Sequence, residues 1–178
     1  MNAIDRRQLL RDALLLVGCA TLIPMEALAR PAQGAKRFFD PDHYAILDAV
    51  AETIIPRTDT PGARDAGVPG RFDAMMLTWA SEARRTQFRQ ILDEMDAAAR
   101  AKHNQGLAAL SAEQQLSVVA TYDHDKSADP QYMKFRALIL TLYYLSEPGA
   151  TQELRYEQTP GVWEPSVKVT PETRAWAV

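Results

Sequence analysis

The histidines and their carboxylate neighbours are the side chains best suited to chemistry in this chain of 178 residues. Asp123, His124 and Asp125 stand in a row, and all three are of types that bind metals. Adjacent residues point in different directions, however, whereas a metal site needs convergent ligands and further groups that orient them. We therefore interpret this row as the solvated end of a helix. His103 is interpreted as a helix-end residue that suits the negative end of the helix dipole.

The remaining signals for catalysis are weak. A hydrolase needs a nucleophile held beside a base, and no serine here lies in a nucleophile-elbow motif. The eight glycines never form the Gly-x-Gly-x-x-Gly motif of dinucleotide-binding domains. The single cysteine, Cys19, cannot supply a Cys-x-x-Cys-His haem attachment, an iron–sulfur cluster or a cysteine-based zinc site. We expect no catalytic, cofactor-binding or metal-binding residue on this chain.

The elements expected to position any site are helices. Asp40-Pro41 and Asp129-Pro130 each place a capping carboxylate before a proline at the first helical position. Ser111 begins a capping box that Gln114 completes. Between these signals apolar residues recur at helical spacing. The predicted helices run from Asp40 to Pro56, around 72–79, over 81–103, after 111 and from 129 to about 145, with a loop over 56–70.

The sequence predicts an all-α protein: a single small domain of about five helices with an irregular, extended C-terminal arm. Its net charge of −3, without a basic stripe, argues against a nucleic-acid-binding protein. The predicted divisions are a signal peptide over 1–29, a flexible lead-in over 30–39, a helical domain over 40–146 and a partner-binding arm over 147–178. The last helix is apolar almost all round, which predicts that it is either central or shared with another chain.

The first 29 residues have the pattern of an export signal. Arg6 and Arg7, followed by a spacer, two leucines and Arg11, resemble the twin-arginine signal, which a receptor reads as an address. The apolar run over 13–23 is too short to span a membrane, which takes about 20 residues. The Ala-x-Ala pattern predicts cleavage after Ala29. We expect a periplasmic protein, or one at the periplasmic face of the inner membrane; an ordinary Sec signal or a basic amphipathic helix is the simpler alternative.

Cys19 leaves a second alternative open. The residues before it, Leu-Val-Gly, resemble a lipobox, in which the cysteine is lipidated and becomes the new N-terminus. Cleavage after Ala29 is the preferred prediction, because the apolar stretch before Cys19 is shorter than the usual core of about 7–15 residues. A lipid-anchored structural protein is the alternative.

Two stretches resemble the gluconate 2-dehydrogenase subunit 3 family: AETIIPRTDTPGARDAGVPGRFDAMM and LYYLSEPGATQELRYEQTPGVWEP. The resemblance runs from about Tyr44 to Pro165. Pro148 departs from it, because such chains commonly have an apolar residue at this position. The resemblance implies a small accessory subunit of a bacterial FAD-dependent sugar dehydrogenase.

The same resemblance implies what the partners are. The catalytic subunit would be an FAD-containing flavoprotein of the GMC type that oxidises a sugar, a sugar acid or a glycoside, and a c-type cytochrome with haem c often takes the electrons onward. The small subunit helps to fold, stabilise and export the flavoprotein. The alternative is a free-standing exported helical enzyme or small-molecule-binding protein. From residue type and position we predict the following interface residues: Thr58, Asp59, Thr60, Pro61, Gly62, Ala63, Tyr143, Tyr144, Glu147, Tyr156 and Trp163.

Overall fold

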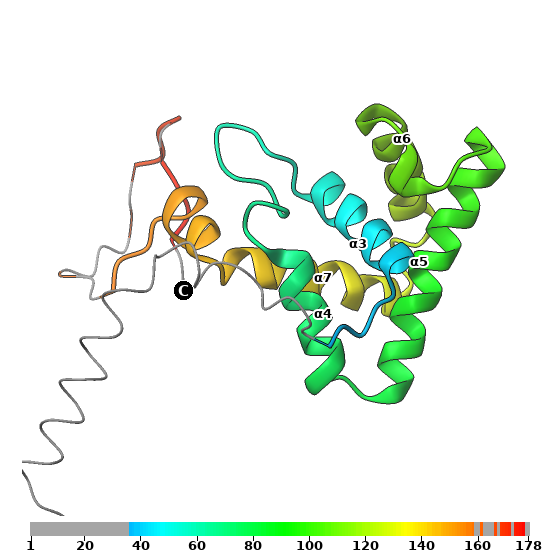
Figure 1. The fold of residues 1–178 in the computed structure, drawn as a ribbon. Coiled ribbons are helices and arrows are strands. Elements are labelled where there is room, and N and C mark those ends of the chain that lie inside the picture. Colours follow the sequence, from blue (N-terminus) through cyan, green and yellow to red (C-terminus); the bar gives the residue numbers. More distant parts are fainter. Residues whose placement is uncertain (1–35, 159–160, 162–165, 167, 172, 177–178) are drawn as a thin grey trace, which may run out of the picture. The chain divides into compact units, whose positions relative to one another are not determined.

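A computed structural model describes residues 36–158, 161, 166, 168–171 and 173–176 (Figure 1). The chain separates into two units, Met1–Lys36 and Arg37–Val178, and the fold described below belongs to the second. The predicted signal peptide, its cleavage site, Cys19 and Trp163 lie outside the described residues.

The described residues form helices, with a single isolated bridge between Arg155 and Trp176 and no longer strand. This confirms the prediction of an all-α protein. None of these helices combines the length and the apolar character that a membrane crossing requires. The elements are α3 (Pro41–Ile54), α4 (Val68–Thr78), α5 (Glu82–His103), the 3-10 turn η1 (Leu107–Ala109), α6 (Ala112–Asp125), α7 (Pro130–Tyr144) and the π-helical turn η2 (Gly149–Glu153).

The helix starts that the sequence predicts are confirmed by their caps. The side chain of Asp40 accepts a hydrogen bond from the backbone N–H of His43, and Asp129 accepts from two N–H groups of the first turn of α7. Ser111 and Gln114 form the reciprocal bonds of a capping box. The predicted end of the loop over 56–70 is wrong, because α4 already begins at Val68. Proline is tolerated in the first turn of a helix, so the proline there does not delay the start.

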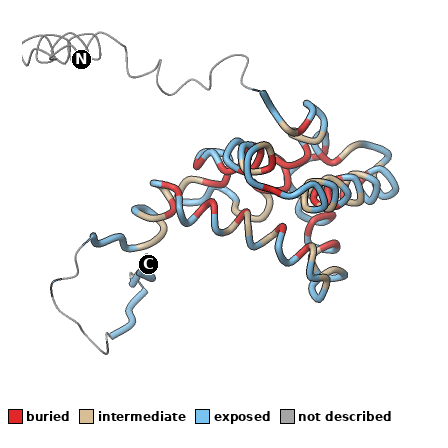
Figure 2. Tube along the Cα trace, turned by 90° about the horizontal axis from the view of Figure 1, so that it is seen from below, coloured by how far each residue is buried: buried red, intermediate tan, exposed pale blue. Residues whose placement is uncertain are grey.

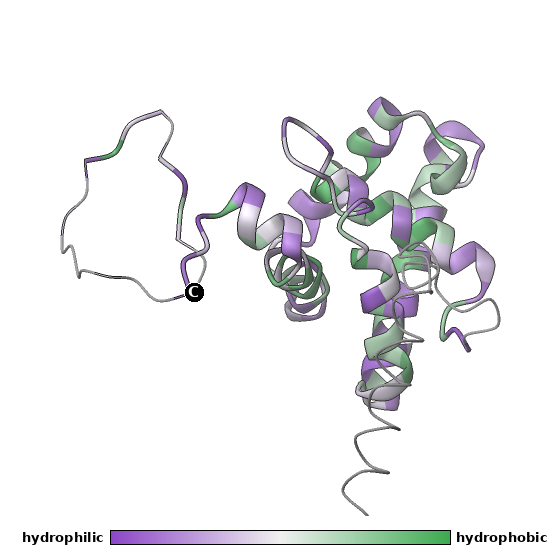
Figure 3. Cartoon of the chain, turned by 60° about the vertical axis from the view of Figure 1, so that its left-hand side comes forward, coloured by the Kyte–Doolittle hydropathy of each residue, from purple (hydrophilic) through white to green (hydrophobic). Residues whose placement is uncertain are grey.

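The core forms where three aromatic rings from distant parts of the chain meet. Phe72 of α4, Phe88 of α5 and Phe135 of α7 lie with their ring centroids 5.3–5.5 Å apart. All three side chains are buried. Buried positions recur along every α-helix, with exposed positions between them (Figure 2), and Figure 3 shows the same alternation in hydropathy. Packing of aromatic and aliphatic side chains therefore joins the five helices into one core.

The last helix, α7, is central to this core. It buries five large side chains, one or more in each turn: Tyr132, Phe135, Ile139, Leu142 and Tyr143. Its exposed positions recur between the buried ones from the first turn onward, with Met133 49% exposed near the start and Tyr144 and the capping Leu145 in solvent at the end. The sequence predicts that this helix is either central to the core or shared with another chain. Along most of its length it is central to the core.

Part of the predicted flexible lead-in is folded instead. The buried carboxylate of Asp73 accepts hydrogen bonds from the backbone N–H groups of Phe38 and Phe39, at 3.1 and 2.8 Å. The ring of Phe39 is buried against Phe72, and the guanidinium of Arg89 lies over the ring of Phe38. The folded domain thus begins before the residue 40 that the sequence predicted, because a carboxylate 34 residues away satisfies the backbone.

The arm predicted over 147–178 is not irregular throughout. The π-helical turn η2 begins it, and the N–H of Leu154 donates to the carbonyl of Gly149 at its end. After η2 the described residues are mostly exposed and irregular apart from a turn and the bridge between Arg155 and Trp176, as predicted for the arm.

Replacement of an aromatic ring in the core should lower the stability of the fold. We expect Phe135→Ala to lower the free energy of unfolding by about 3–5 kcal/mol, because it removes buried area and leaves a cavity. Urea unfolding followed by far-UV circular dichroism measures this change. Leu116→Ala is the control, since Leu116 is 57% exposed and a surface change costs about 0.5 kcal/mol or less. Equal losses in the two variants would contradict the assignment of the core.

Candidate functional site

Of the three histidines, His43 makes side-chain contacts between helices, whereas the buried Nε2 of His103 has no hydrogen-bond partner among the described residues. His43 lies between two carboxylates, with Nδ1 2.6 Å from Asp40 Oδ2 and Nε2 2.9 Å from Asp93 Oδ1. It thereby joins the start of α3 to the middle of α5. His103 and His124 stand in the last turns of α5 and α6. Within the described residues, no three His, Cys, Asp or Glu side chains are grouped as metal ligands.

Two buried tyrosines make the other notable polar contacts. Tyr122 donates a hydrogen bond to Glu94 Oε2 at 2.7 Å, and Tyr132 donates to Asp123 Oδ1 at 2.9 Å. Burial and then these bonds raise the pKa of both hydroxyls. The bond from Tyr122 lowers the pKa of Glu94 below its usual value, against the effect of partial burial. These groups hold α5, α6 and α7 together, and neither hydroxyl is set up as a nucleophile.

The predicted interface residues are brought together from two distant segments. The hydroxyl of Tyr143 donates to the carbonyl of Pro61 at 2.8 Å, so the end of α7 holds the loop between α3 and α4. One residue earlier, Thr60 Oγ1 donates to Glu153 Oε2 of η2 at 2.7 Å. Burial raises the pKa of Tyr143, which keeps its proton available for the bond to the loop. The loop, the end of α7 and η2 therefore form one hydrogen-bonded unit.

The loop owes its shape to a carboxylate at the end of α3. The two oxygens of Glu52 accept from the backbone N–H groups of Arg57 and Arg64, at 3.2 and 2.9 Å. Gly62 lies directly against this contact, and a Cβ there would stand 2.6 Å from Glu52 Oε1 and 2.7 Å from the nitrogen of Arg57. A larger residue at this position would displace the carboxylate that organises the loop.

A tight corner sets the direction of η2 relative to α7. Ser146 is fully buried, and its hydroxyl donates to the carbonyl of Tyr143 while it accepts from the N–H of Gly149 at 3.1 Å. Gly149 packs so closely on the end of α7 that a Cβ would lie 2.1 Å from the carbonyl oxygen of Tyr143. The corner thus requires glycine at one position and a short hydroxyl side chain at the other.

This corner leaves two apolar side chains in solvent. Tyr144 is 40% exposed and its ring meets the ring of Tyr143 edge to face, with centroids 5.3 Å apart. Leu145 beside it is 69% exposed. We give the name α7 end patch to Tyr144 and Leu145 together with residues 58–63 and η2, which hydrogen bonds from Tyr143 and Thr60 join to the end of α7. Leu145 was not among the predicted interface residues, although its place in an apolar run just before Ser-Glu-Pro-Gly was a signal for it.

The other predicted interface residues divide by exposure. Tyr143 is 2% exposed, and Gly62 and Ala63 are also buried, so these three support the patch from inside. Thr58 and Asp59 are exposed in the loop, while Glu147 and Tyr156 are exposed in the segment after α7. Their role in binding remains a prediction, as does that of Trp163.

The end of the chain returns to η2. The N–H of Arg155 donates to the carbonyl of Ala175 at 2.7 Å, and its guanidinium lies 4.2 Å from the centre of the Trp176 ring. Arg174 donates to the carbonyl of Gln152 at 2.7 Å and to that of Thr151. A π-helical turn leaves carbonyl groups without partners at its end, and Arg174 satisfies two of them.

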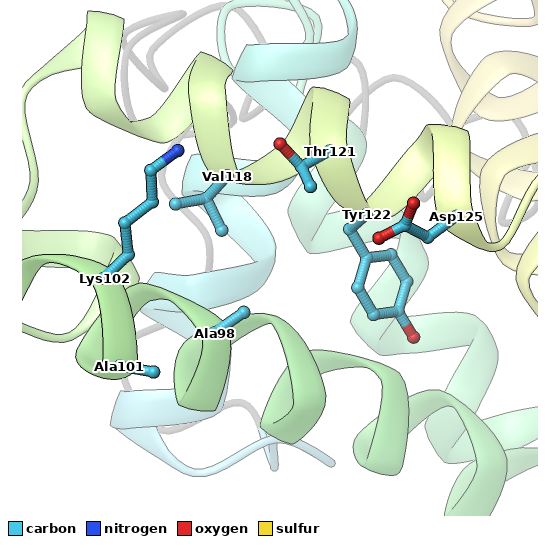
Figure 4. Close-up of a pocket in the computed structure, with 7 residues that line it drawn as sticks. All are labelled: Ala98, Ala101, Lys102, Val118, Thr121, Tyr122 and Asp125. Carbon is cyan, nitrogen blue, oxygen red and sulfur yellow. The ribbon is translucent and has the colours of Figure 1, made fainter.

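A groove between α5 and α6 has a volume of about 410 Å³ (Figure 4). Ala98, Ala101 and Val118 give it an apolar floor. Lys102 and Asp125 stand at its two ends, and the amine of Lys102 donates to Ser117. The hydroxyl of Tyr122 in this lining is the one already bonded to Glu94.

Comparison with known proteins agrees with the resemblance seen in the sequence. The family model described as Gluconate 2-dehydrogenase subunit 3 matches residues 41–161, more than half of the chain. The match begins at the first residue of α3 and extends beyond η2, so it includes the whole α7 end patch. No curated protein and no solved structure matches the chain.

The corner between α7 and η2 should tolerate no side chain at Gly149. We expect Gly149→Ala to lower the free energy of unfolding by about 1–3 kcal/mol, because the added Cβ would overlap the carbonyl of Tyr143. Gly161→Ala is the matched control, since nothing lies within 4 Å of its Cβ position. Urea denaturation of both variants checks this, and an unchanged midpoint for Gly149→Ala would contradict the described corner.

The bond between Tyr122 and Glu94 predicts part of the response to acid. The folded state lowers the pKa of Glu94 below the usual 4.5, so its contribution is present above that value and is lost as the pH falls below it. Tyr122→Phe removes the largest cause of the shift, so this variant should lose less stability between about pH 6 and pH 3 than the wild type does. Unfolding midpoints across this range measure the difference. Tyr156→Phe, at an exposed position, should follow the wild type; a Tyr122→Phe curve parallel to the wild type would refute the coupling.

Proposed function

Because the chain belongs to the gluconate 2-dehydrogenase subunit 3 family, we propose that it is the non-catalytic small subunit of a periplasmic FAD-dependent dehydrogenase complex. The family match over residues 41–161 carries this proposal. The family is one of accessory subunits and implies membership of a gluconate dehydrogenase complex. The side chains of His43, Tyr122 and Tyr132 are consistent with this proposal, because each makes a contact that holds two helices together.

The proposed partner is a flavoprotein of the GMC type that holds FAD and oxidises a sugar, a sugar acid or a glycoside. A c-type cytochrome with haem c would pass the electrons to the respiratory chain. In this arrangement the small subunit holds no cofactor of its own and contributes binding energy that stabilises the flavoprotein. Anything that binds the folded state of a protein and not its unfolded state stabilises it.

The proposed second role is export. Twin-arginine export carries folded proteins, often with their cofactors already bound, yet this chain's sequence offers no cofactor motif. If the chain binds the FAD-loaded flavoprotein before export, the signal at Arg6 and Arg7 serves both subunits. Cleavage after Ala29 would then release the complex into the periplasm, whereas lipidation of Cys19 would hold it at the membrane.

Replacement of the arginine pair tests the shared signal. We expect Arg6→Lys with Arg7→Lys to retain the flavoprotein in the cytoplasm, because the receptor reads the arginine pair and not charge alone. Cell fractionation with flavin absorbance and immunoblotting of both subunits measures this. Arg11→Lys is the control, since it keeps the pair intact. A flavoprotein that reaches the periplasm normally without the pair would contradict the shared-signal proposal.

A further inference from the structure

We propose that the α7 end patch is the surface that docks the flavoprotein subunit, with Tyr144 and Leu145 as its apolar centre and carboxylates around them that fit a basic face of the partner. This inference rests on the proposed function and adds to it the place of contact and the chemistry of the surface that it meets.

The apolar centre has the composition of an interface core. Tyr144 and Leu145 are neighbours, and they are 40% and 69% exposed. Tyrosine is enriched at the centres of interfaces, because its ring supplies a large contact area. Trp79 at the end of α4, Leu116 on α6 and Met133 near the start of α7 are 73%, 57% and 49% exposed, but none has an exposed large apolar residue next to it in the chain, and scattered exposed apolar residues are normal on a surface. An adjacent pair at the end of a central helix is therefore the stronger candidate.

The side chains and backbone that support Tyr144 and Leu145 are held by contacts within this chain. The Tyr143 ring supports Tyr144 edge to face, and its hydroxyl holds Pro61. The corner formed by Ser146 and Gly149 sets the backbone on the far side of Leu145. Side chains and loops that are already ordered lose less entropy on binding, so a preorganised surface binds more tightly than a flexible one with the same contacts.

The charges around the pair favour a basic partner face. Asp59 lies next to the bond between Thr60 and Glu153, and Glu147 lies in the exposed segment after Leu145. Two cations nearby in sequence are paired with acids outside this set: Arg57 with Asp65 at 3.3 Å, and Arg155 with Glu157 at 3.4 Å. Arg174, which donates to carbonyl groups of η2, adds one positive charge against the three carboxylates of Asp59, Glu147 and Glu153. The frame of the patch is thus acidic, and complementary charge on the partner would speed association and fix its orientation.

A pair of arginine substitutions at equally apolar positions tests the surface. Purified full-length chain is titrated against the purified flavoprotein subunit, with binding followed by biolayer interferometry and the partner identified by its flavin absorbance. Leu145→Arg should weaken binding by about tenfold or more, because it places a cation at the centre of a contact with a basic face. Leu116→Arg, the matched control on α6, should change affinity by about twofold or less.

A second set of variants distinguishes the effect of a surface charge on binding from a loss of binding that is caused by unfolding. Glu147→Gln should slow association and reduce its dependence on salt, because a charge at the edge of an interface acts mainly on the association rate. Tyr144→Ala should raise the dissociation rate while the circular dichroism spectrum and the melting temperature stay close to those of the wild type. A variant that loses binding and also unfolds does not count as support.

The outcomes distinguish the two proposals. A wild-type chain that binds no flavoprotein would overturn the proposed function itself. A wild-type chain that binds it, with Leu145→Arg binding equally well, would overturn the docking surface and leave the proposed function in place. Loss of binding in Leu116→Arg alone would move the contact to α6. A homodimer, detected by light scattering and abolished by Leu145→Arg, would assign the patch to a second copy of this chain and also overturn the inference.

Discussion

The contact of Phe72, Phe88 and Phe135 is the interaction on which the rest of the structure depends. A chain with a single cysteine cannot close a disulfide within itself, so this domain must be held by packing. The three rings join α4, α5 and α7, and edge-to-face contacts between buried aromatic rings add to the stability that their burial provides. Once α7 is fixed in this way, its last turn becomes a rigid support for the loop before α4 and for η2.

The parts of the fold that could be predicted are those decided by local chemistry. Asp40, Ser111 and Asp129 cap helices by bonds to residues two or three positions away, so a short stretch of sequence contains all the necessary information. The folded start of the domain could not be predicted in this way. Phe38 and Phe39 are ordered by Asp73, 34 or 35 residues away, and nothing near them in sequence shows that a carboxylate will come to their backbone.

The same distinction between local sequence signals and distant contacts applies to the candidate site. The loop over 58–63, Tyr143 and Tyr144 were named from residue type and from an apolar run, and the structure does bring them together. It also buries Tyr143, which the sequence could not show, because a helix that is apolar all round has no pattern to separate its inner face from its outer one. The carboxylates of Glu52 and Glu153, which hold the loop, gave no signal, since exposed and structural glutamates look alike in a sequence.

The end of the chain is coupled to the α7 end patch through the backbone of η2. Arg174 binds carbonyl groups at the end of this turn, and the start of the same turn packs against Tyr143 through Gly149. Glu153 of η2 also accepts the bond from Thr60, which ties the turn to the loop. A partner that contacts the described part of the arm would therefore act on the same turn that frames Tyr144 and Leu145. This coupling has a physical advantage in the proposed role of a small subunit: contacts at the arm and at the patch would order one shared element, so the entropy cost of fixing η2 is incurred once for both.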